Sequence, residues 1–324
     1  MRITINHVAK KAGVSIATVS RVLNGTANVD ALKRLRVEEA VQTLGFRPNS
    51  IARSLSRKKS NTIGLIVPTI VNPFFNTIAE SVEKRASEKG YKIILCNSNN
   101  DALNEKKYIE SLLQNQIDAF VIISDNKIDQ NFNVPVVFLD RYSAVIGNSH
   151  PIIRSDHYKG GVMAIEHLIK KGCKKIAYIG KEKINPQKYE RIDGFLDTME
   201  ENKFQPIIQF SEYNYEAGLE AAKLLLDKHN DLDGIFAGND LIAYAVMKEA
   251  FNRGISIPKN LKLVGYDNIM FSELITPSLT TIEQPVENLG KLAVDVIVDI
   301  LNDKRIMKND MVLPVKLIER DTTK

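Results

Sequence analysis

Short apolar runs alternate with amphipathic segments along most of this chain, and this alternation restricts the fold more than any other feature. The runs are TIGLIVP, YKIILCNS, AFVIIS, PVVFLD, KKIAYIG, GIFAGND and LKLVGYD. The amphipathic segments have helical spacing and include 76–89, 158–171, 187–202, 215–229 and 240–253. Strands that alternate with helices are typical of parallel sheets covered on both faces. Because there are too many strands for one compact sheet, the pattern predicts an α/β core of two Rossmann-like lobes.

The first 59 residues differ in charge from the rest. They contain 12 Lys or Arg and 3 Asp or Glu, whereas the remaining residues contain 32 and 36. A basic segment attached to a mildly acidic body favours a polyanion as the partner of that segment. Charge alone leaves a solvated basic surface as an equal alternative.

The basic segment carries the pattern of a helix-turn-helix. Residues 5–12 have helical spacing of apolar residues, and Gly13 supplies the positive φ that ends a helix. Ser15 is a good N-cap for a second short helix over 16–23. Two short helices joined by a tight turn that contains glycine predict a small all-α head.

A third helix is predicted over 31–44, with Asp30 as its N-cap and Gly45 after its last residue. Its apolar side is expected to consist of Leu35, Val37, Val41 and Leu44.

The second helix suits the major groove of DNA, because its leading end carries short side chains. Ile16 and Ala17 stand at that end and would contact thymine methyl groups, while Arg21, one turn on, would pair with guanine. The polar residues of this helix are suited to contact phosphates or base edges. They are Ser15, Thr18, Ser20 and Asn24. A helical domain that binds protein is the weaker alternative.

The stretch VAKKAGVSIATVSRVLNG closely resembles the DNA-binding signature of the lactose/galactose repressor family, and GFRPNSIARSL resembles the linker of that family. The resemblance implies a DNA-binding domain at 1–46, a linker with a hinge helix at 47–61, and a sugar-binding and dimerisation core at 62–324. It makes Ile16, Ala17 and Arg21 the residues that read bases. In the linker it implies DNA contacts from Asn49, Ala52, Arg53 and Leu55, with the leucine wedged between bases.

Polar residues follow the predicted strands, and ligands of such sheets bind beyond the carboxyl ends of the strands. Carboxylates, amides and arginines beside two phenylalanines suit a sugar, because hydroxyls need donors and acceptors while the C–H faces pack on aromatic rings. The candidate residues are Asn72, Phe74, Phe75, Asp140, Arg141, Arg191, Asn239, Asp267 and Gln284. Taken singly, each has a structural alternative as a helix cap, a core residue or a surface ion pair.

From about residue 62 to its end, the chain resembles the periplasmic-binding-protein-like sensor of the same family, in which the chain crosses between lobes near 157, 285 and 313. By this resemblance the nine candidates match the residue types with which ribose-binding proteins hold ribose. Ser155, Asp156 and Tyr213 match as wall residues, and VPVVFLDR and ERIDGF look like ribose operon repressors. The resemblance therefore implies D-ribose as effector, with other sugars, a sugar phosphate or a phosphocarrier protein as alternatives.

The resemblance also implies a homodimeric transcriptional repressor that binds a near-palindromic DNA operator. Sugar binding would close the cleft and displace the linkers, although some relatives use the small molecule as a corepressor. The C-terminus, LIERDTTK, carries no heptad extension that would form a tetramer, so a dimer is expected.

An enzyme and a transport binding protein are the rival classes. The sequence has no G-x-G-x-x-G after a strand, no G-x-x-x-x-G-K-[ST] and no G-x-S-x-G, and its five histidines lack metal-ligand spacing. Catalysis, a cofactor and a bound metal are therefore not expected. No apolar run has the length of a membrane span and the first residues lack a secretory core, so a cytoplasmic protein without membrane contact is expected.

Overall fold

A computed structural model describes residues 3–25, 29–46, 59–128, 132–142, 150–182, 190–306 and 308–324. The chain divides into two compact units, residues 1–60 and residues 61–324, and each is described by itself. In the described ranges no helix has both the length and the apolarity to cross a membrane.

The first unit is a bundle of three helices, α1 (Ile5–Ala12), α2 (Ile16–Asn24) and α3 (Ala31–Leu44). The predicted caps are confirmed, because Ser15 accepts the amide of Thr18 and Asp30 accepts the amide of Lys33. Glycines with positive φ follow α1 and α3 as predicted, and α2 runs one residue beyond the predicted 16–23 and is followed by Gly25, also with positive φ. The three helices share a small core built around Val8, Val19 and Val37.

The prediction that Leu35 lies on the apolar side of α3 is wrong, because its side chain is 54% exposed. The residues of α3 that face the core are Val37, Ala40, Val41 and Leu44. Leu35 precedes Val37 by two residues, which is a rotation of about 200° around a helix, so it lies on the opposite face.

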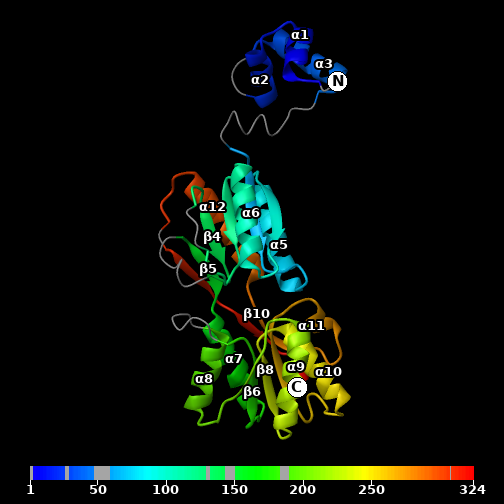
Figure 1. Cartoon of the computed structure of the whole chain (residues 1–324), viewed down its shortest axis with the longest axis vertical. Coiled ribbons are helices and arrows are strands. Elements are labelled where there is room, and N and C mark those ends of the chain that lie inside the picture. The colour runs from blue at the N-terminus through cyan, green and yellow to red at the C-terminus, as the bar shows by residue number, and fades with distance from the viewer. Residues whose placement is uncertain are drawn as a thin grey trace. The chain divides into compact units, whose positions relative to one another are not determined.

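The second unit contains two six-stranded sheets whose strands follow the same order in space. Figure 1 shows the two lobes that hold these sheets, with β4 and β5 labelled in the first and β6 and β8 in the second. The first sheet has the order β11-β5-β4-β3-β1-β2, with β1 (Thr62–Val67), β2 (Lys92–Asn97), β3 (Ala119–Ile122), β4 (Val136–Leu139), β5 (Ile152–Ser155) and β11 (Asp310–Leu313). The second has the order β12-β10-β9-β8-β6-β7, with β6 (Ile176–Gly180), β7 (Ile207–Phe210), β8 (Gly234–Ala237), β9 (Lys262–Asp267), β10 (Thr280–Glu283) and β12 (Lys316–Ile318). All strand pairs are parallel except β10 with β12. Each strand of one sheet therefore has a counterpart at the same place in the other sheet; β4, for example, corresponds to β9.

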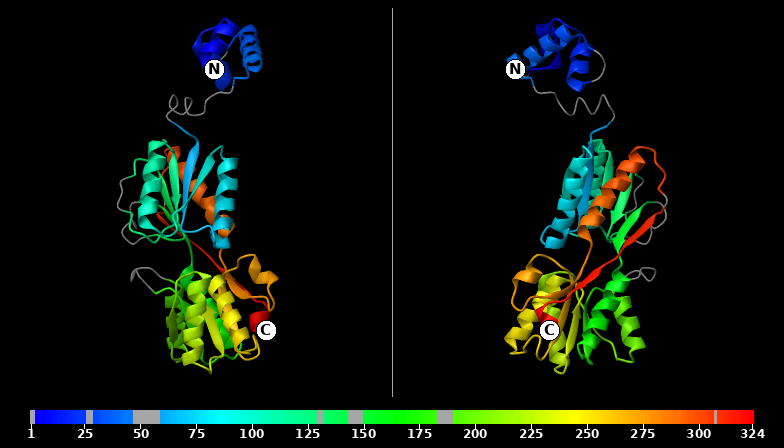
Figure 2. Two further views of the ribbon diagram at one scale, coloured as in Figure 1. Left: turned by 45° about the vertical axis from the view of Figure 1, so that its right-hand side comes forward. Right: turned by 180° about the vertical axis from the view of Figure 1, so that it is seen from behind.

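Helices cover both faces of each sheet, which gives two three-layered lobes. In the first lobe, α5 (Pro73–Glu88) and α12 (Val286–Leu301) share one buried apolar cluster, and α6 (Ala102–Gln114) packs in a second cluster on the other face. Figure 2 shows α12, in orange, beside the much earlier α5. Burial on both faces explains why the strands β1, β3 and β4 are continuous apolar runs.

In the second lobe, α7 (His157–Lys170) and α8 (Arg191–Glu201) cover one face of the sheet. The other face is covered by α9 (Tyr215–Lys228) and α10 (Asp240–Asn252). A short α11 (Phe271–Leu274) follows β9, and a 3-10 turn, η2 (Asp321–Thr323), ends the chain. The chain passes between the lobes three times: between β5 and α7, between β10 and α12, and between β11 and β12.

Candidate DNA-binding and effector-binding sites

The outward face of α2 carries the predicted base readers. Ile16 is 49% exposed, and Ala17 and Arg21 are exposed as well. Ser15 caps the helix, and its hydroxyl oxygen also lies 2.9 Å from the hydroxyl oxygen of Thr18. Thr18 and Ser20 are half-buried. The exposed end of α2 therefore presents short side chains and one arginine to a partner.

Several predicted DNA contacts lie outside the described residues. They are the side chain of Asn24 and the linker residues Asn49, Ala52, Arg53 and Leu55.

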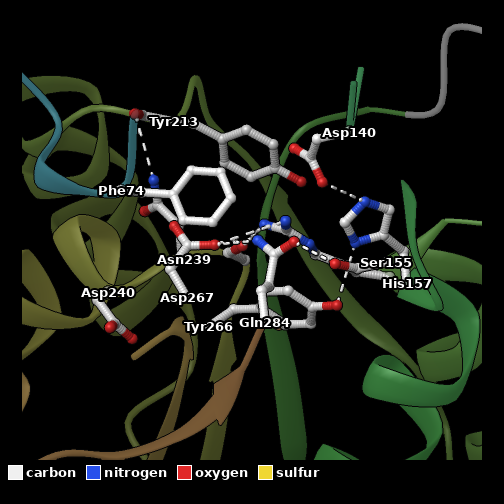
Figure 3. A network of polar contacts seen from close by, with 12 residues as sticks. Phe74, Asp140, Ser155, His157, Tyr213, Asn239, Asp240, Tyr266, Asp267 and Gln284 are labelled. Carbon is white, nitrogen blue, oxygen red and sulfur yellow. Dashed lines mark hydrogen bonds and ion pairs between the residues drawn. The ribbon is translucent and has the colours of Figure 1, made fainter. Parts of the chain in front are cut away.

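In the second unit, predicted polar residues from both lobes converge at the carboxyl ends of the strands (Figure 3). Asp140 follows β4 and Asp267 ends β9, so the two acids hold corresponding positions in the two sheets. Ser155 ends β5 and Gln284 follows its counterpart β10. The repeated strand order thus delivers two pairs of corresponding side chains to one place.

Arg191 lies at the centre of this network, as the first residue of α8 and only 6% exposed. Its guanidinium lies 3.6 Å from the centre of the Tyr266 ring and 3.6 Å from Oδ1 of Asp267, and it donates to the carbonyl of Gly238. The close crossing of α7 and α8 sets its position, because a Cβ on Gly161 would lie 2.2 Å from the carbonyl oxygen of Arg191. Glycine is therefore required at residue 161.

Asp267 forms the end of a hydrogen-bonded chain that links the lobes. Ser155 Oγ donates to Gln284 Oε1 at 2.7 Å, and Gln284 Nε2 donates to Asp267 Oδ1 at 2.7 Å. Burial raises the pKa of Asp267 to about 7, although Arg191 opposes the shift. The backbone of Asp267 has φ 113°, a strained value for a residue other than glycine.

Asp140 is also buried, but its pKa is shifted in the opposite direction. Burial acts to raise its pKa, yet His157, Arg191 and Arg141 together outweigh burial and lower the pKa to about 2. Nε2 of His157 lies 3.1 Å from Oδ1 of Asp140. That oxygen nevertheless has no correctly aligned hydrogen bond from any residue that the structure describes. An ionised, buried oxygen without an aligned donor is a place for a hydroxyl of a ligand.

The predicted aromatic residues lie beside this network. Phe74 and Phe75 pack edge to face, with ring centres 5.2 Å apart, and belong to the core of the first lobe. Arg141 lies 5.0 Å from the ring centre of Phe75 and 5.4 Å from that of Tyr213.

These aromatic residues also line cavities. Phe75, Arg141 and Tyr213 line one of about 290 Å³. A second cavity, of about 460 Å³, is lined partly by Phe74, Asp267 and Gln284. Both cavities are large enough for a small ligand and its water.

The amides among the predicted residues cap helices. The side chain of Asn72 accepts the amide of Phe74 at the start of α5, and that of Asn239 accepts the amide of Ile242 at the start of α10. Asn239 also donates to the carbonyl of Tyr213 at 3.3 Å. Asp156, considered as a wall residue, caps α7 through the amide of Lys159. Ligand contacts from these three residues remain predictions.

Three further residues of the network, His157, which is half-buried, and the buried Tyr266 and Asp240, were not among the predicted site residues. His157 contacts Asp140, and Tyr266 packs under Arg191. Asp240 accepts hydrogen bonds from Ser272, Thr281 and the amide of Ile269, and burial raises its pKa to about 6. His157 stands two residues beyond the end of β5, and Asp240 directly follows Asn239, so the strand-end rule could have found both positions.

Comparisons with known proteins agree with the two-part architecture. A family model described as bacterial regulatory proteins of the lacI family matches residues 4–49, and one described as periplasmic binding protein-like domain matches residues 165–323. A ribose operon repressor of Halalkalibacterium halodurans is 37% identical over 99% of this chain and 97% of its own.

Two solved structures are also similar. The lac repressor dimer bound to operator and the anti-inducer ONPF has a TM-score of 0.88 and 27% identity, and the match covers 100% of this chain and 99% of that one. A regulator of Alkaliphilus metalliredigens complexed with D-xylulofuranose has a TM-score of 0.74 and 36% identity over 82% of this chain and 99% of its own. The predicted fold class, a helix-turn-helix head with a periplasmic-binding-protein-like core, is confirmed.

Proposed function

The chain belongs to the lacI family of bacterial regulatory proteins, and from this membership we propose that it is a homodimeric repressor of a sugar-utilisation operon, controlled by D-ribose. The relatives are transcriptional regulators rather than enzymes, in agreement with the sequence prediction. We propose that residues 1–46 and the linker at 47–61 bind a near-palindromic operator, and that residues 62–324 bind the sugar and the second subunit.

The observation that carries the sugar proposal is the convergence of ionised and neutral polar groups from both lobes. Asp140 offers an ionised acceptor without an aligned donor, and Asp267 and Gln284 add acceptor and donor groups from the second lobe. Phe74 and Phe75 each line one of the two cavities, where their rings suit the C–H face of a sugar. A ligand that contacts both lobes stabilises the arrangement in which they are close.

Two sugars of related chemistry are candidates for the effector. D-Ribose is supported by the 37% identical relative, which is named a ribose operon repressor. D-Xylulose is the second candidate, because the 36% identical regulator was solved with D-xylulofuranose. Both are five-carbon sugars, and both present hydroxyls to carboxylate and amide groups.

The dimer proposal is supported by exposed apolar side chains on both lobes. Ile94 and Leu95 are exposed on β2, an edge strand of its sheet, and Met270, Phe271 and Leu274 are exposed on or beside α11. Exposed apolar side chains on an edge strand and a short surface helix are typical of a protein interface. The similar solved structure is a dimer on its operator, so a second copy of this chain is the proposed occupant.

Control follows from thermodynamic coupling. If sugar binding weakens operator binding by some factor, operator must weaken sugar binding by the same factor. Such couplings are typically about 1–3 kcal/mol. We propose that lobe closure transmits this free energy to the linkers of the dimer.

Fluorescence anisotropy of the full-length protein on labelled promoter-region DNA tests the proposal. At fixed salt, ribose is expected to release the DNA at lower concentration than xylulose, arabinose or glucose. If xylulose alone releases the DNA, xylulose rather than ribose is the effector. If neither sugar releases the DNA, the proposal of a five-carbon sugar as effector is wrong. Arg21→Ala is expected to abolish specific DNA binding, and the exposed Asp303→Asn, which also has positive φ (58°), serves as a neutral control.

A further inference from the structure

His157 joins the two lobes inside the polar network. It is the first residue of α7 in the second lobe, and its side chain is 13% exposed. Its Nε2 lies 3.1 Å from Oδ1 of Asp140, which belongs to the first lobe. Its Nδ1 lies 3.1 Å from the hydroxyl oxygen of Tyr266. One imidazole therefore contacts the proposed sugar acceptor on one side and the second lobe on the other.

The two contacts determine which ring nitrogen carries the proton. Burial lowers the pKa of His157 although Asp140 opposes the shift, so the ring is neutral near pH 7, and the protonated ring that lowers the pKa of Asp140 forms only in acid. Burial raises the pKa of Tyr266, which keeps its phenol protonated. Ionised Asp140 can only accept a hydrogen bond. Nε2 must then carry the proton toward Asp140, while Nδ1 accepts from Tyr266.

Tyr266 is held too tightly to adapt to a different ring orientation. One face of its ring lies 3.6 Å from the Arg191 guanidinium, and a Cβ on Gly160 would lie 2.7 Å from its ring and hydroxyl atoms. The hydroxyl therefore fixes the orientation of His157 rather than following it. The other charged groups near the imidazole are Arg191 and Glu190, both at the start of α8.

We propose that His157 is the positioning residue through which the second lobe fixes the Asp140 carboxylate for the effector. The role rests on the proposed function, because Asp140 is the acceptor assigned to the sugar. The Nε2–H group of His157 lies 3.1 Å from Oδ1 of Asp140 without hydrogen-bond alignment, so it holds the carboxylate by electrostatic attraction and leaves that oxygen able to accept from the effector. When the lobes separate, this donor leaves with the second lobe, so Asp140 is fully positioned only in the closed arrangement. His157 thereby makes effector affinity depend on lobe closure.

Matched substitutions separate the two contacts of the ring. In His157→Gln the amide nitrogen is placed near the position of Nε2 and can still donate to Asp140. In His157→Asn the shorter amide replaces only the Nδ1 side and does not reach Asp140. Sugar affinity of the full-length dimer is expected to fall about tenfold or more in the Asn and Ala variants and to stay within about threefold of wild type in the Gln variant. His229→Gln, at the end of α9, is the control and is expected to match wild type.

Equal losses in the Gln and Asn variants, or wild-type affinity in the Ala variant, would overturn the proposal. Operator affinity without sugar and thermal unfolding, measured on each variant, show whether a loss reflects misfolding.

A second measurement is independent of which sugar binds. Nitrogen-15 NMR of histidine-labelled full-length protein is expected to show His157 as the neutral ring protonated at Nε2, identified by the signal missing from His157→Gln. Asp140→Asn is expected to shift that signal. If wild type binds no sugar but the signal behaves in this way, the proposed effector is wrong while the link from His157 to Asp140 stands. A ring protonated at Nδ1, or a signal indifferent to Asp140→Asn, would refute the link.

Discussion

The two lobes place an aspartate at the same position and shift its pKa in opposite directions. Asp140 follows β4 and Asp267 ends β9, the corresponding strands of sheets with the same strand order. Both are buried and both have positive φ, 61° and 113°. The pKa is about 2 for Asp140 and about 7 for Asp267.

The difference arises from the neighbours rather than from the fold position. Asp140 has an imidazole at 3.1 Å and two arginines nearby, and together these outweigh its burial. Asp267 has Arg191 at 3.6 Å, but the charges of Asp240 and Asp140 add to its burial. The repeated strand order places a carboxyl group at the end of the corresponding strand in each lobe. Side chains from other elements then raise or lower the pKa of that group.

Removing Arg191 is expected to have the largest effect, because both acids depend on this cation. Above pH 7, where Asp267 is mostly ionised, loss of one partner of a buried ion pair typically costs about 3–5 kcal/mol. Arg191→Ala should therefore lower the free energy of unfolding, measured by urea denaturation, by about that amount. It should also abolish the release of DNA by sugar. Arg191→Lys keeps the charge but loses the planar contact with Tyr266, so it should recover stability more than sugar response. Wild-type stability of the Ala variant would show that the acids do not need this cation.

Replacing each acid by its amide tests whether the charge difference matters for the effector. A hydrogen bond to a charged group is worth about 1.5–3 kcal/mol, so Asp140→Asn should weaken the sugar about 10- to 100-fold. At pH 6 Asp267 is mostly protonated, so Asp267→Asn should weaken the sugar less than about tenfold. The measurement is sugar titration of the preformed protein–DNA complex, with Asp303→Asn as the control. Equal losses would mean that the two acids carry the same charge in the bound state.

The pH dependence of stability should have opposite sign for the two acids. Asp267 has a raised pKa, so its contribution is fully present below pH 4 and is lost as pH rises to about 7, by about 1.4 kcal/mol per unit. Asp140 has a lowered pKa, so its contribution is present above pH 4 and is lost as pH falls toward 2. The free energy of unfolding in urea is measured at several pH values for wild type, Asp140→Asn and Asp267→Asn. The difference between wild type and each variant gives the pH-dependent contribution of that aspartate. A wild-type curve parallel to that of Asp267→Asn between pH 4 and 7 would contradict the raised pKa.

The smallest effects are expected at the two asparagine caps, one in each lobe. Loss of an N-cap typically costs about 1 kcal/mol, so Asn72→Ala and Asn239→Ala should each lower stability by that amount. Serine retains the capping oxygen but not the amide group. If Asn72→Ser and Asn239→Ser restore stability but still bind sugar more weakly than wild type, these residues contact the ligand as well. Full recovery of both properties would assign them to capping alone.

Sequence patterns predicted much of this architecture because they record local physics. The helix ends at Gly13 and Gly45, the caps Ser15 and Asp30, and the alternation of buried strands with amphipathic helices all depend on neighbours in the chain. The error at Leu35 came from counting apolar residues without following the rotation of the helix relative to its partners.

The candidate effector site was predictable in its location but not in its connections. Strand ends pointed to Asp140, Asp267 and Gln284, since parallel strands bring their carboxyl ends to one edge. His157 and Tyr266 were missed because their importance lies in contacts with residues that are distant in sequence. Both residues stand at or beside a strand end, so spacing could indicate their positions but not their contacts with each other and with Asp140.

The sequence by itself determined that this chain has a basic helix-turn-helix head and a core of parallel α/β lobes, because capping, helical period and strand burial are local properties. Only the tertiary structure decided that corresponding strands bring Asp140 and Asp267 to the network around one buried arginine. The direction of each pKa shift also depends on the tertiary structure, because a pKa in a buried site depends on the distances to charges and dipoles that folding brings from elsewhere in the chain.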